Sequence, residues 1–303
     1  MNTKQLIYVL TLAECGSFSK AAAELNISQP SLSQYIRKTE EEAGIGLFER
    51  TGSFIRMTDA GRVYAETGRK ILELEHDMLN RFSDISQNSS GTVVIGISAH
   101  RSVCLMPSVV AAYKRKYPGV CVLLKEYPRD ELIERAGHGE FDLCITTPPV
   151  SEKLFETVAD FEEEILLAVS ENTALCEELS AGFPDGRVDL LGLDGQDFAM
   201  LNDQHPMQKQ LQEICENYSL RLNRTVECTS LETLISMVGE NIGAALVPAC
   251  LRTLGGRGIK FFRIAQPIPR RSIILVHRRG QYLTARVADM SSIITDKLSA
   301  YFG

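Results

Sequence analysis

Small and polar side chains recur at helical spacing between residues 28 and 38, on a stretch whose other side is apolar. Ser28 can cap a helix there, and the first turn tolerates the missing N–H of a proline. At about 100° per residue, Leu32 and Ile36 point to one side. The opposite side carries Pro30, Ser33, Gln34 and Arg37, with Gln29 at the exposed N-terminal end. Such side chains can contact base edges and phosphates in the major groove of DNA.

The alternative is a plain solvated helix face, which is what most short polar helices present. The next segment changes this balance, because residues 47–58 predict two short strands around Gly52-Ser53 that carry arginines. A β-hairpin beside such a helix forms a wing, whose arginines can reach phosphates or the minor groove. The DNA contacts that we expect are Ser28, Gln29, Pro30, Ser31, Ser33, Gln34, Arg37, Lys38, Arg50, Arg56 and Thr58.

A second short helix must hold this reading helix in place. Residues 17–25 predict it, because Ser17 is a good N-cap and one side is apolar, with Phe18, Ala21, Ala22 and Leu25. The run from Gly16 to Gly61 resembles the winged helix-turn-helix of LysR-type transcriptional regulators. The matching residues are Gly16-Ser17-Phe18, Ala21-Ala22, Leu25, Ser28-Gln29-Pro30, Ser33, Ile36, Leu47-Phe48-Glu49-Arg50 and Thr58-Asp59-Ala60-Gly61.

The chain departs from that family pattern at Thr39, Ala43 and Met57, where leucine is common and where we expect core-facing side chains. The resemblance implies a DNA-binding domain in residues 1–58 of a cytoplasmic transcription regulator. It also implies a homodimer or homotetramer on a partly palindromic operator, with RNA polymerase as a further partner.

Residues 59–86 contain no proline and follow Thr58, a good N-cap, so they predict one long helix of roughly 40 Å. Its apolar stripe consists of Val63, Thr67, Ile71, Leu74, Met78, Phe82 and Ile85. A partner helix would cover this stripe and join two DNA-binding heads. Packing against the chain's own C-terminal part is the alternative, and the resemblance favours the dimer. Residues 59–90 thus form a linker, and the polar residues 87–91 form a hinge at its C-terminal end, where the next domain begins.

From Thr92 onward, apolar runs alternate with amphipathic stretches, which predicts an α/β fold with a mostly parallel sheet covered by helices. The predicted strands are residues 92–98, 119–127, 141–147, 162–170, 197–201, 224–228, 243–248 and 270–278. The predicted helices are residues 101–117, 129–139, 206–218 and 230–240, and one from about 283 to the end.

Residues 91–303 resemble the family's effector domain, which has two α/β lobes like those of periplasmic solute-binding proteins. The resemblance implies a first lobe of residues 92–161 and 267–303 and a second lobe of residues 162–266. The chain would cross near Asp160-Phe161 and again near Ala265-Gln266-Pro267. A crossing of two strands is a hinge, and ligands bind at the carboxyl ends of the strands.

The candidate effector site follows from that rule. A helix that begins after the first strand favours an anion, and polar residues end other strands. The expected contacts are Ser98, His100, Arg101, Thr146, Thr147, Leu201, Asn202, Thr229 and Ser230. Two alternatives need no ligand: Thr229 and Glu232 have the spacing of a capping box, and Arg101 could pair with a surface carboxylate.

Composition excludes several other classes of protein. No apolar run is long enough for a membrane helix, and the N-terminus lacks a signal-peptide pattern. The eight cysteines show no C-x-x-C spacing, which argues against zinc and against a disulfide framework. The net charge is −7, but residues 1–58 balance six basic against six acidic residues. Affinity for DNA would therefore require two copies of the module.

The predicted function is a sequence-specific DNA-binding regulator controlled by a small-molecule effector, an organic anion bound between the lobes. An enzyme is disfavoured, because no phosphate loop, G-x-S-x-G elbow or H-E-x-x-H motif occurs. We expect no catalytic residue, cofactor or metal ion. The alternatives are an effector-independent regulator and a redox-responsive one. In the peroxide-responsive relatives a cysteine stands where Met200 ends the strand, which leaves Cys215 and Cys228 as the candidate pair.

Overall fold

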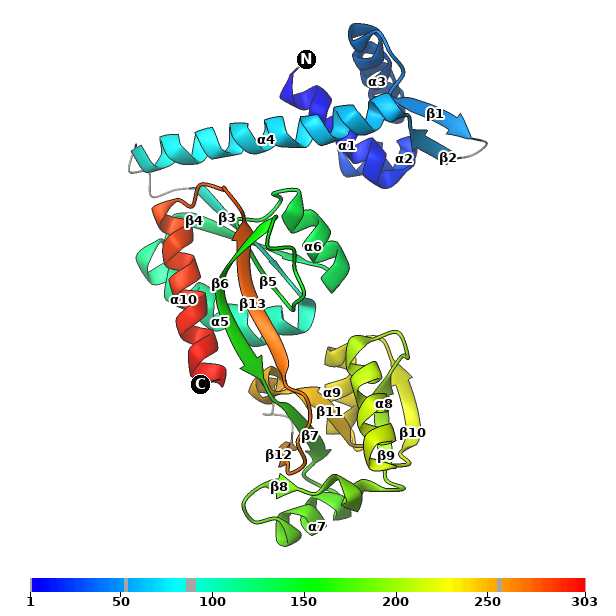
Figure 1. Ribbon diagram of the computed structural model, residues 1–303, viewed down its shortest axis with the longest axis vertical. Helices are drawn as coiled ribbons and strands as arrows, with labels where there is room; N and C mark the ends of the chain where they lie inside the picture. Colours follow the sequence, from blue (N-terminus) through cyan, green and yellow to red (C-terminus); the bar gives the residue numbers. More distant parts are fainter. Residues whose placement is uncertain (1, 52–53, 86–90, 255–257, 303) are drawn as a thin grey trace. The chain divides into compact units, whose positions relative to one another are not determined.

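The computed structural model describes residues 2–51, 54–85, 91–254 and 258–302. Its contacts divide the chain into two compact units, Met1–Gln87 (unit 1) and Asn88–Gly303 (unit 2). Figure 1 labels the helices and strands of both. None of the helices in the described ranges has the length and apolar character that crossing a bilayer requires.

Unit 1 is a small helical bundle followed by a hairpin and a long helix. Its elements are α1 (Thr3–Cys15), α2 (Phe18–Glu24), α3 (Gln29–Ala43), β1 (Phe48–Thr51), β2 (Phe54–Met57) and α4 (Asp59–Ile85). Leu32 and Ile36 are buried with Val9, Leu12 and Leu47, so the predicted inner side of the reading helix is confirmed. The predicted hairpin and long helix are also present.

The three residues that depart from the family pattern, Thr39, Ala43 and Met57, differ in how deeply they are buried. Thr39 is buried, and its hydroxyl donates to the Tyr35 carbonyl, which satisfies it inside the core. Ala43 is exposed, so the expectation that it faces the core is wrong. The reason is that Ala43 is the last residue of α3, before the C-cap Gly44, and lines an open groove beside α4 instead of the closed core. Met57 is half-buried.

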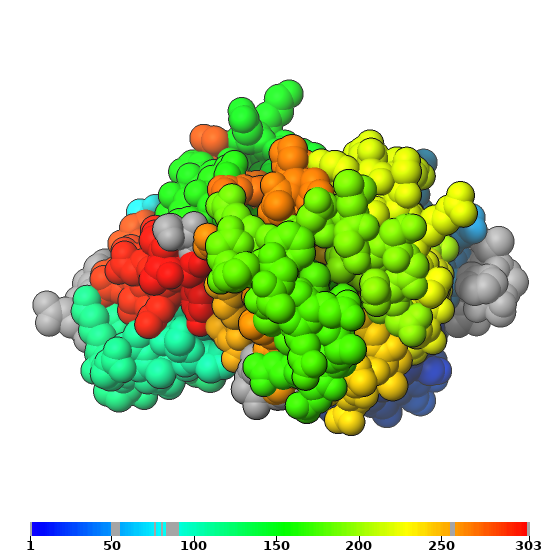
Figure 2. Space-filling model, turned by 90° about the horizontal axis from the view of Figure 1, so that it is seen from below, coloured from blue at the N-terminus to red at the C-terminus, as the bar shows by residue number. Residues whose placement is uncertain are grey.

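The first lobe of unit 2 is built on a five-stranded sheet of order β4-β3-β5-β13-β6. The strands are β3 (Gly91–Ile97), β4 (Val120–Glu126), β5 (Leu143–Thr146), β6 (Phe155–Glu163) and β13 (Arg271–Arg278). α5 (Ala99–Lys116) and α10 (Ala285–Phe302) cover one face, where Ile273 and Leu275 are buried. α6 (Arg129–Gly137) covers the other face, where Ile274 and Val276 are buried. Figure 2 shows α10, in red, lying against α5, in teal.

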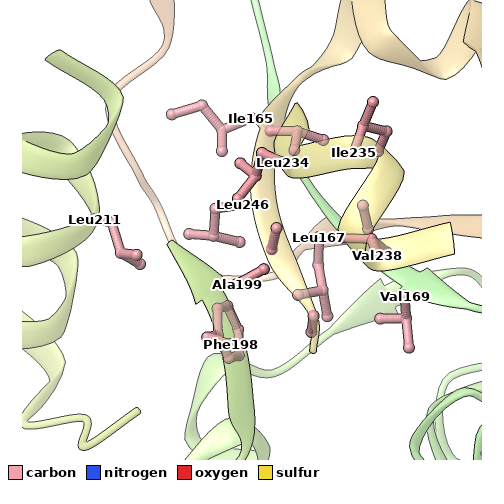
Figure 3. Close-up of a cluster of buried hydrophobic side chains, with 14 of the residues drawn as sticks. Ile165, Leu167, Val169, Phe198, Ala199, Leu211, Leu234, Ile235, Val238 and Leu246 are labelled. Atoms are coloured by element: carbon pink, nitrogen blue, oxygen red, sulfur yellow. The ribbon is translucent and has the colours of Figure 1, made fainter. Parts of the chain in front are cut away.

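The second lobe is built on a four-stranded sheet of order β11-β7-β12-β8 and a parallel pair of β9 and β10. Its strands are β7 (Ile165–Ser170), β8 (Arg187–Val188), β9 (Asp197–Leu201), β10 (Asn223–Cys228), β11 (Ala245–Pro248) and β12 (Ile259–Ile264). Its helices are α7 (Ala174–Gly182), η1 (Leu190–Leu193), α8 (Pro206–Tyr218), α9 (Leu231–Gly239) and η2 (Ala249–Leu254). Figure 3 shows its core, where side chains of β7, β9 and β11 meet those of α9.

The sheets are mixed, so the prediction of a mostly parallel sheet is wrong. Only the β3 pairs with β4 and β5 are parallel in the first lobe, and β7 pairs antiparallel with both neighbours within the described residues. The sequence also gave no prediction for β6, α7 or β12. β6 is an edge strand whose interior positions are half-buried or exposed and include Glu156, Asp160 and Glu162, so no alternation of apolar and polar residues marks it.

Two segments connect the lobes. The chain leaves the first sheet at the end of β6 and enters β7 after a single residue, Glu164. It returns between β12 and β13, through residues 265–270. Glu163 and Arg271 are register partners where these two segments run side by side.

Candidate DNA-reading surface and anion site

The N-terminal end of α3 presents an open polar surface. Ser28 caps the helix, since its hydroxyl accepts the Ser31 N–H at 3.3 Å and hydrogen-bonds the Ser31 hydroxyl at 2.7 Å. Gln29, Pro30 and Gln34 are exposed, whereas Ser33 is half-buried. The cap therefore uses Ser28 and Ser31 to shape the turn and leaves the glutamines free for contacts.

The cations of this surface are held by weak pairs. The Arg37 Nε lies 3.0 Å from Glu41, and the Lys38 Nζ lies 4.0 Å from Glu42, on exposed side chains one helical turn away. Exposed ion pairs contribute little free energy, about 0.2–1 kcal/mol. A phosphate group could therefore replace either glutamate at small cost.

The wing is fixed to α3 by Glu40. Its Oε1 accepts the N–H groups of Leu47 and Phe48 at 2.7 and 3.0 Å, which sets where β1 starts. Arg56 is exposed on β2, opposite Glu49. The Arg50 backbone lies on β1, and its side chain is outside what the structure describes. Gly52-Ser53, the predicted turn, also lies outside the described residues.

Thr58 does not project from the surface. Its hydroxyl donates to the Gly46 carbonyl at 2.8 Å and accepts the Gly61 N–H at 3.0 Å, so it caps α4 and ties the helix to the loop before β1.

α4 carries exposed apolar side chains along its predicted stripe. Val63, Leu74, Met78 and Phe82 are all exposed, and Leu74 keeps 70% of its surface. Ile71 is half-buried, and the side chain of Ile85 lies outside what the structure describes. The stripe runs into a groove of about 520 Å³ between α1, the end of α3 and α4, with Leu6, Ile45 and Tyr64 among its lining residues. Unit 1 alone leaves this surface uncovered.

In unit 2, a buried ion pair lies where the lobes meet. The Arg101 NH2 is 3.3 Å from the Glu163 Oε2, and both side chains are almost fully buried. The other carboxylate oxygen of Glu163 accepts the Cys250 N–H at 3.2 Å. The Arg101 NH1 also reaches the Ser98 hydroxyl at 3.4 Å. Arg101 thus has a buried partner, in contrast to the surface carboxylate expected as an alternative.

Arg271 adds a second cation to this pair. It lies across from Glu163 on the neighbouring strand, and its NH1 is buried without a hydrogen-bond partner. Burial, with the nearby charge of Arg101, lowers the pKa of Arg271 to about 10, so it stays charged at neutral pH. This buried cluster therefore contains two positively charged side chains, Arg101 and Arg271, and one negatively charged side chain, Glu163.

Two histidines next to Arg271 are neutral. Burial, followed by the charges of Arg101 and Arg271, holds the pKa of His100 well below its usual value. Burial and then Arg271 lower the pKa of His205 to about 4. The His205 Nδ1 accepts the Met207 N–H at 3.1 Å and caps α8, while the buried His100 Nε2 has no partner.

Thr146 joins the first-lobe side of this cluster through strand register. β3 and β5 are parallel with Gly96 opposite Cys144, so Ser98 and Thr146 follow at the same edge, two residues on. The Thr146 hydroxyl is buried and has no hydrogen-bond partner. Thr147 is already engaged, because its carbonyl and hydroxyl accept the Arg129 Nε at 3.1 and 3.2 Å.

Most of the candidate effector contacts in the second lobe already form hydrogen bonds with neighbouring residues. The Leu201 N–H donates to the Gln208 side chain, and the Asn202 side chain accepts the Gln204 N–H. Ser230, not Thr229, caps α9 by accepting the Thr233 N–H, so the capping box from Thr229 to Glu232, considered above as an alternative to ligand binding, does not form. Thr229 is exposed.

The structure thus groups Ser98, His100 and Arg101 with three residues that sequence reasoning missed: Glu163, His205 and Arg271. The signal for His205 was its place before Pro206, at the start of a helix after a strand. Within the described ranges, no three His, Cys, Asp or Glu side chains gather as a metal site would require.

Two family models match the chain. The "LysR substrate binding domain" matches residues 86–299, and the "Bacterial regulatory helix-turn-helix protein, lysR family" matches residues 3–62. Among curated proteins, a "Hydrogen peroxide-inducible genes activator" of Haemophilus influenzae is 32% identical over 99% of this chain and 98% of that protein. The "DNA-binding transcriptional dual regulator OxyR" of Escherichia coli is 29% identical over 100% of this chain and 97% of that protein.

Solved structures share the fold. A variant of full-length OxyR from Pseudomonas aeruginosa superposes with a TM-score of 0.64 at 22% identity, covering 98% of this chain and 94% of that one. Full-length CbnR in complex with its target DNA gives a TM-score of 0.54 at 19% identity, covering 98% of this chain and 100% of that one.

Proposed function

This chain belongs to the LysR family of bacterial DNA-binding transcriptional regulators, and from that premise we propose that a small organic anion, bound in unit 2, controls how two copies of unit 1 sit on an operator. In this proposal residues 1–58 read DNA, residues 59–90 join the copies and residues 91–303 bind the effector. The relatives are regulators, which supports a role without catalysis.

One observation carries the effector proposal: buried polar atoms without partners surround an excess of positive charge. These atoms are the His100 Nε2, the Arg101 Nε, the Thr146 Oγ1 and the Arg271 NH1. Leaving such groups unpaired costs about 1–3 kcal/mol each, and more for charged ones. A carboxylate would neutralise the extra arginine and accept from the free donors, so its binding would recover that cost.

The same geometry suggests how the effector would act. Arg101 and His100 lie at the start of α5 in the first lobe, whereas His205 starts α8 in the second. An anion that contacts both would favour one lobe arrangement over another, and a ligand acts only through such a difference in affinity. Asn202, Thr229 and Ser230 would contribute only if the second lobe rearranged.

For DNA, we propose that Gln29, Ser33, Gln34 and Arg37 read bases while Lys38, Arg50 and Arg56 contact phosphates. The exposed face of α3 and its cap support this assignment. Two heads joined through α4 would read half-sites about one helical turn apart or a multiple of it, roughly 10–10.5 base pairs. The exposed stripe and the groove beside α4 support the dimer.

Selection of bound duplexes from a random-sequence library tests this proposal directly. Full-length protein should enrich a partly palindromic sequence with two related half-sites. Enrichment of a single, asymmetric half-site would contradict a symmetric dimer on DNA. We place the protein in the cytoplasm, with RNA polymerase as the partner through which bound protein changes transcription.

A redox-responsive regulator is the second candidate, supported by the names of the relatives. Cys215 on α8 and Cys228 on β10 were the pair expected from the sequence. Burial raises the pKa of both thiols, which disfavours the reactive thiolate. Mass spectrometry after peroxide treatment would show a bond between them, and an unchanged mass would exclude it.

A further inference from the structure

Cys104 and Cys250 belong to different lobes and meet in the interior of unit 2. Cys104 lies on α5, one turn after Arg101, yet its side chain packs within the core of the second lobe. Cys250 lies in η2, directly after β11, and η2 packs against α5. Both residues are 6% exposed, and each thiol shifts the pKa of the other, which places the two side chains near one another.

The two thiols also face the same small cavity. Its volume is about 10 Å³, and its other lining residues are Arg101, Leu105, Ile273, Leu298 and Tyr301. A cavity of about 10–15 Å³ holds one water-sized molecule. The space beside the two sulfur atoms is therefore of the size of one water molecule.

The surroundings give the two sulfur atoms different roles. The neighbouring Cys250 thiol lowers the pKa of Cys104 despite its burial, and the nearby Thr253 hydroxyl adds to this effect. The Cys104 thiol, followed by burial, raises the pKa of Cys250 well above its usual value. Cys104 is thus the better nucleophile, and Cys250 keeps its proton as the donor. By contrast, burial raises the pKa of Cys144 to about 12.

We propose that Cys104 and Cys250 form a reversible disulfide bond that ties α5 of the first lobe to η2 of the second when a small hydroperoxide reaches their shared cavity. The Cys104 thiolate attacks a peroxide oxygen, the O–O bond breaks, and a sulfenic acid forms while the released oxygen takes a proton. The Cys250 sulfur then attacks the Cys104 sulfur. The S–O bond breaks, and water leaves with the Cys250 proton.

The electrons balance in this sequence. The two thiols lose two hydrogens and two electrons in total, and the hydroperoxide is reduced to water and an alcohol, or to two waters if it is hydrogen peroxide. A dithiol reductant reverses the bond by exchange.

The bond would form beside the charges that connect the lobes. The Cys250 N–H donates to Glu163, which pairs with Arg101 on the same helix as Cys104. A disulfide here would therefore fix η2 against α5 at the hinge. This proposal needs neither an effector nor DNA, so its test does not depend on the regulator's ligand.

Peptide mapping of the full-length protein tests the proposal. The protein is treated with hydrogen peroxide, denatured with an alkylating reagent, digested and analysed by mass spectrometry. We expect the peptides that contain Cys104 and Cys250 to be joined, and separated by dithiothreitol, while Cys144 and Cys176 carry the alkyl group. Alkylation of both Cys104 and Cys250, or a bond from Cys104 to another cysteine, would overturn the proposal.

Variants and stability give a second readout. Cys250→Ser should leave Cys104 as a sulfenic acid that dimedone traps, and the control Cys215→Ser should keep the Cys104 bond. Peroxide should raise the thermal midpoint of the wild-type protein, because a crosslink restricts the unfolded chain, and dithiothreitol should reverse the rise. An unchanged midpoint would refute the claim that the bond ties the lobes. The mapping uses wild-type protein, so it remains decisive if a variant misfolds.

Discussion

Glu163 and Arg271 lie opposite each other on β6 and β13, in the two segments through which the chain passes between its lobes. Glu163 is the acid that compensates buried Arg101, and Arg271 is the cation that remains in excess. The hinge and the proposed anion site therefore share residues. Binding of an anion would therefore change the interactions at the hinge, because Glu163 and Arg271 belong to both.

Replacing the buried acid should destabilise unit 2 strongly. Glu163→Gln removes the charge that compensates Arg101, and breaking one side of a buried pair costs about 3–5 kcal/mol. Urea denaturation measures this loss. The matched control is Glu162→Gln, because Glu162 is exposed and pairs with exposed Arg270, so its loss should stay within about 1 kcal/mol. Equal losses for both variants would contradict the burial of the Arg101 pair.

Stability should fall on mild acidification because of His205. Its pKa is lowered from 6.5 to about 4 in the folded protein, so the unfolded chain binds a proton more readily. The contribution of neutral His205 is complete above pH 6.5 and is lost as the pH falls toward 4. His205→Asn keeps a good N-cap residue for α8 and should reduce this slope in urea melts at a series of pH values. An unchanged slope would mean that His205 titrates normally.

Substitutions of base-reading residues and of phosphate-binding residues should affect DNA affinity in different ways. Gln34→Ala should cost about 1–3 kcal/mol on the operator and little on random DNA, because it removes a base contact. Arg56→Ala should weaken binding to all sequences and reduce the slope of log affinity against log salt by about 1. Fluorescence anisotropy over a salt series measures both. If Gln34→Ala leaves discrimination intact, α3 presents a different face to DNA.

The dimer should depend on the stripe of α4. Leu74→Glu places a charge among exposed apolar side chains that we expect a second copy to cover, so light scattering should report monomers. Arg62→Glu is the control, because Arg62 is exposed on the far side of the same helix and should leave the dimer intact. A dimeric Leu74→Glu protein would place the interface elsewhere.

The sequence predicted what depends on local periodicity and missed what depends on distant pairing. Leu32, Ile36 and the open side of α3 follow from a period of 3.6 residues, and the structure places them accordingly. Arg101 was identified at the end of a strand, but its partner Glu163 is 62 residues away. No local sequence pattern links Arg101 to Glu163. None links Arg271 to Glu163 either, because strand register makes these two residues neighbours. β6 was missed because an acidic edge strand looks like a loop.

Thermal unfolding of the full-length protein against a panel of small carboxylates tests the central claim most directly. An effector at about a hundred times its dissociation constant adds roughly 2.7 kcal/mol to stability, a clear shift in the midpoint. Wild type and Arg270→Met, which alters an exposed neighbour, should respond alike, whereas Arg271→Met should lose the response. A carboxylate that stabilises Arg271→Met as well as wild type would contradict the anion site. No response from wild type to any carboxylate would contradict control by an organic anion.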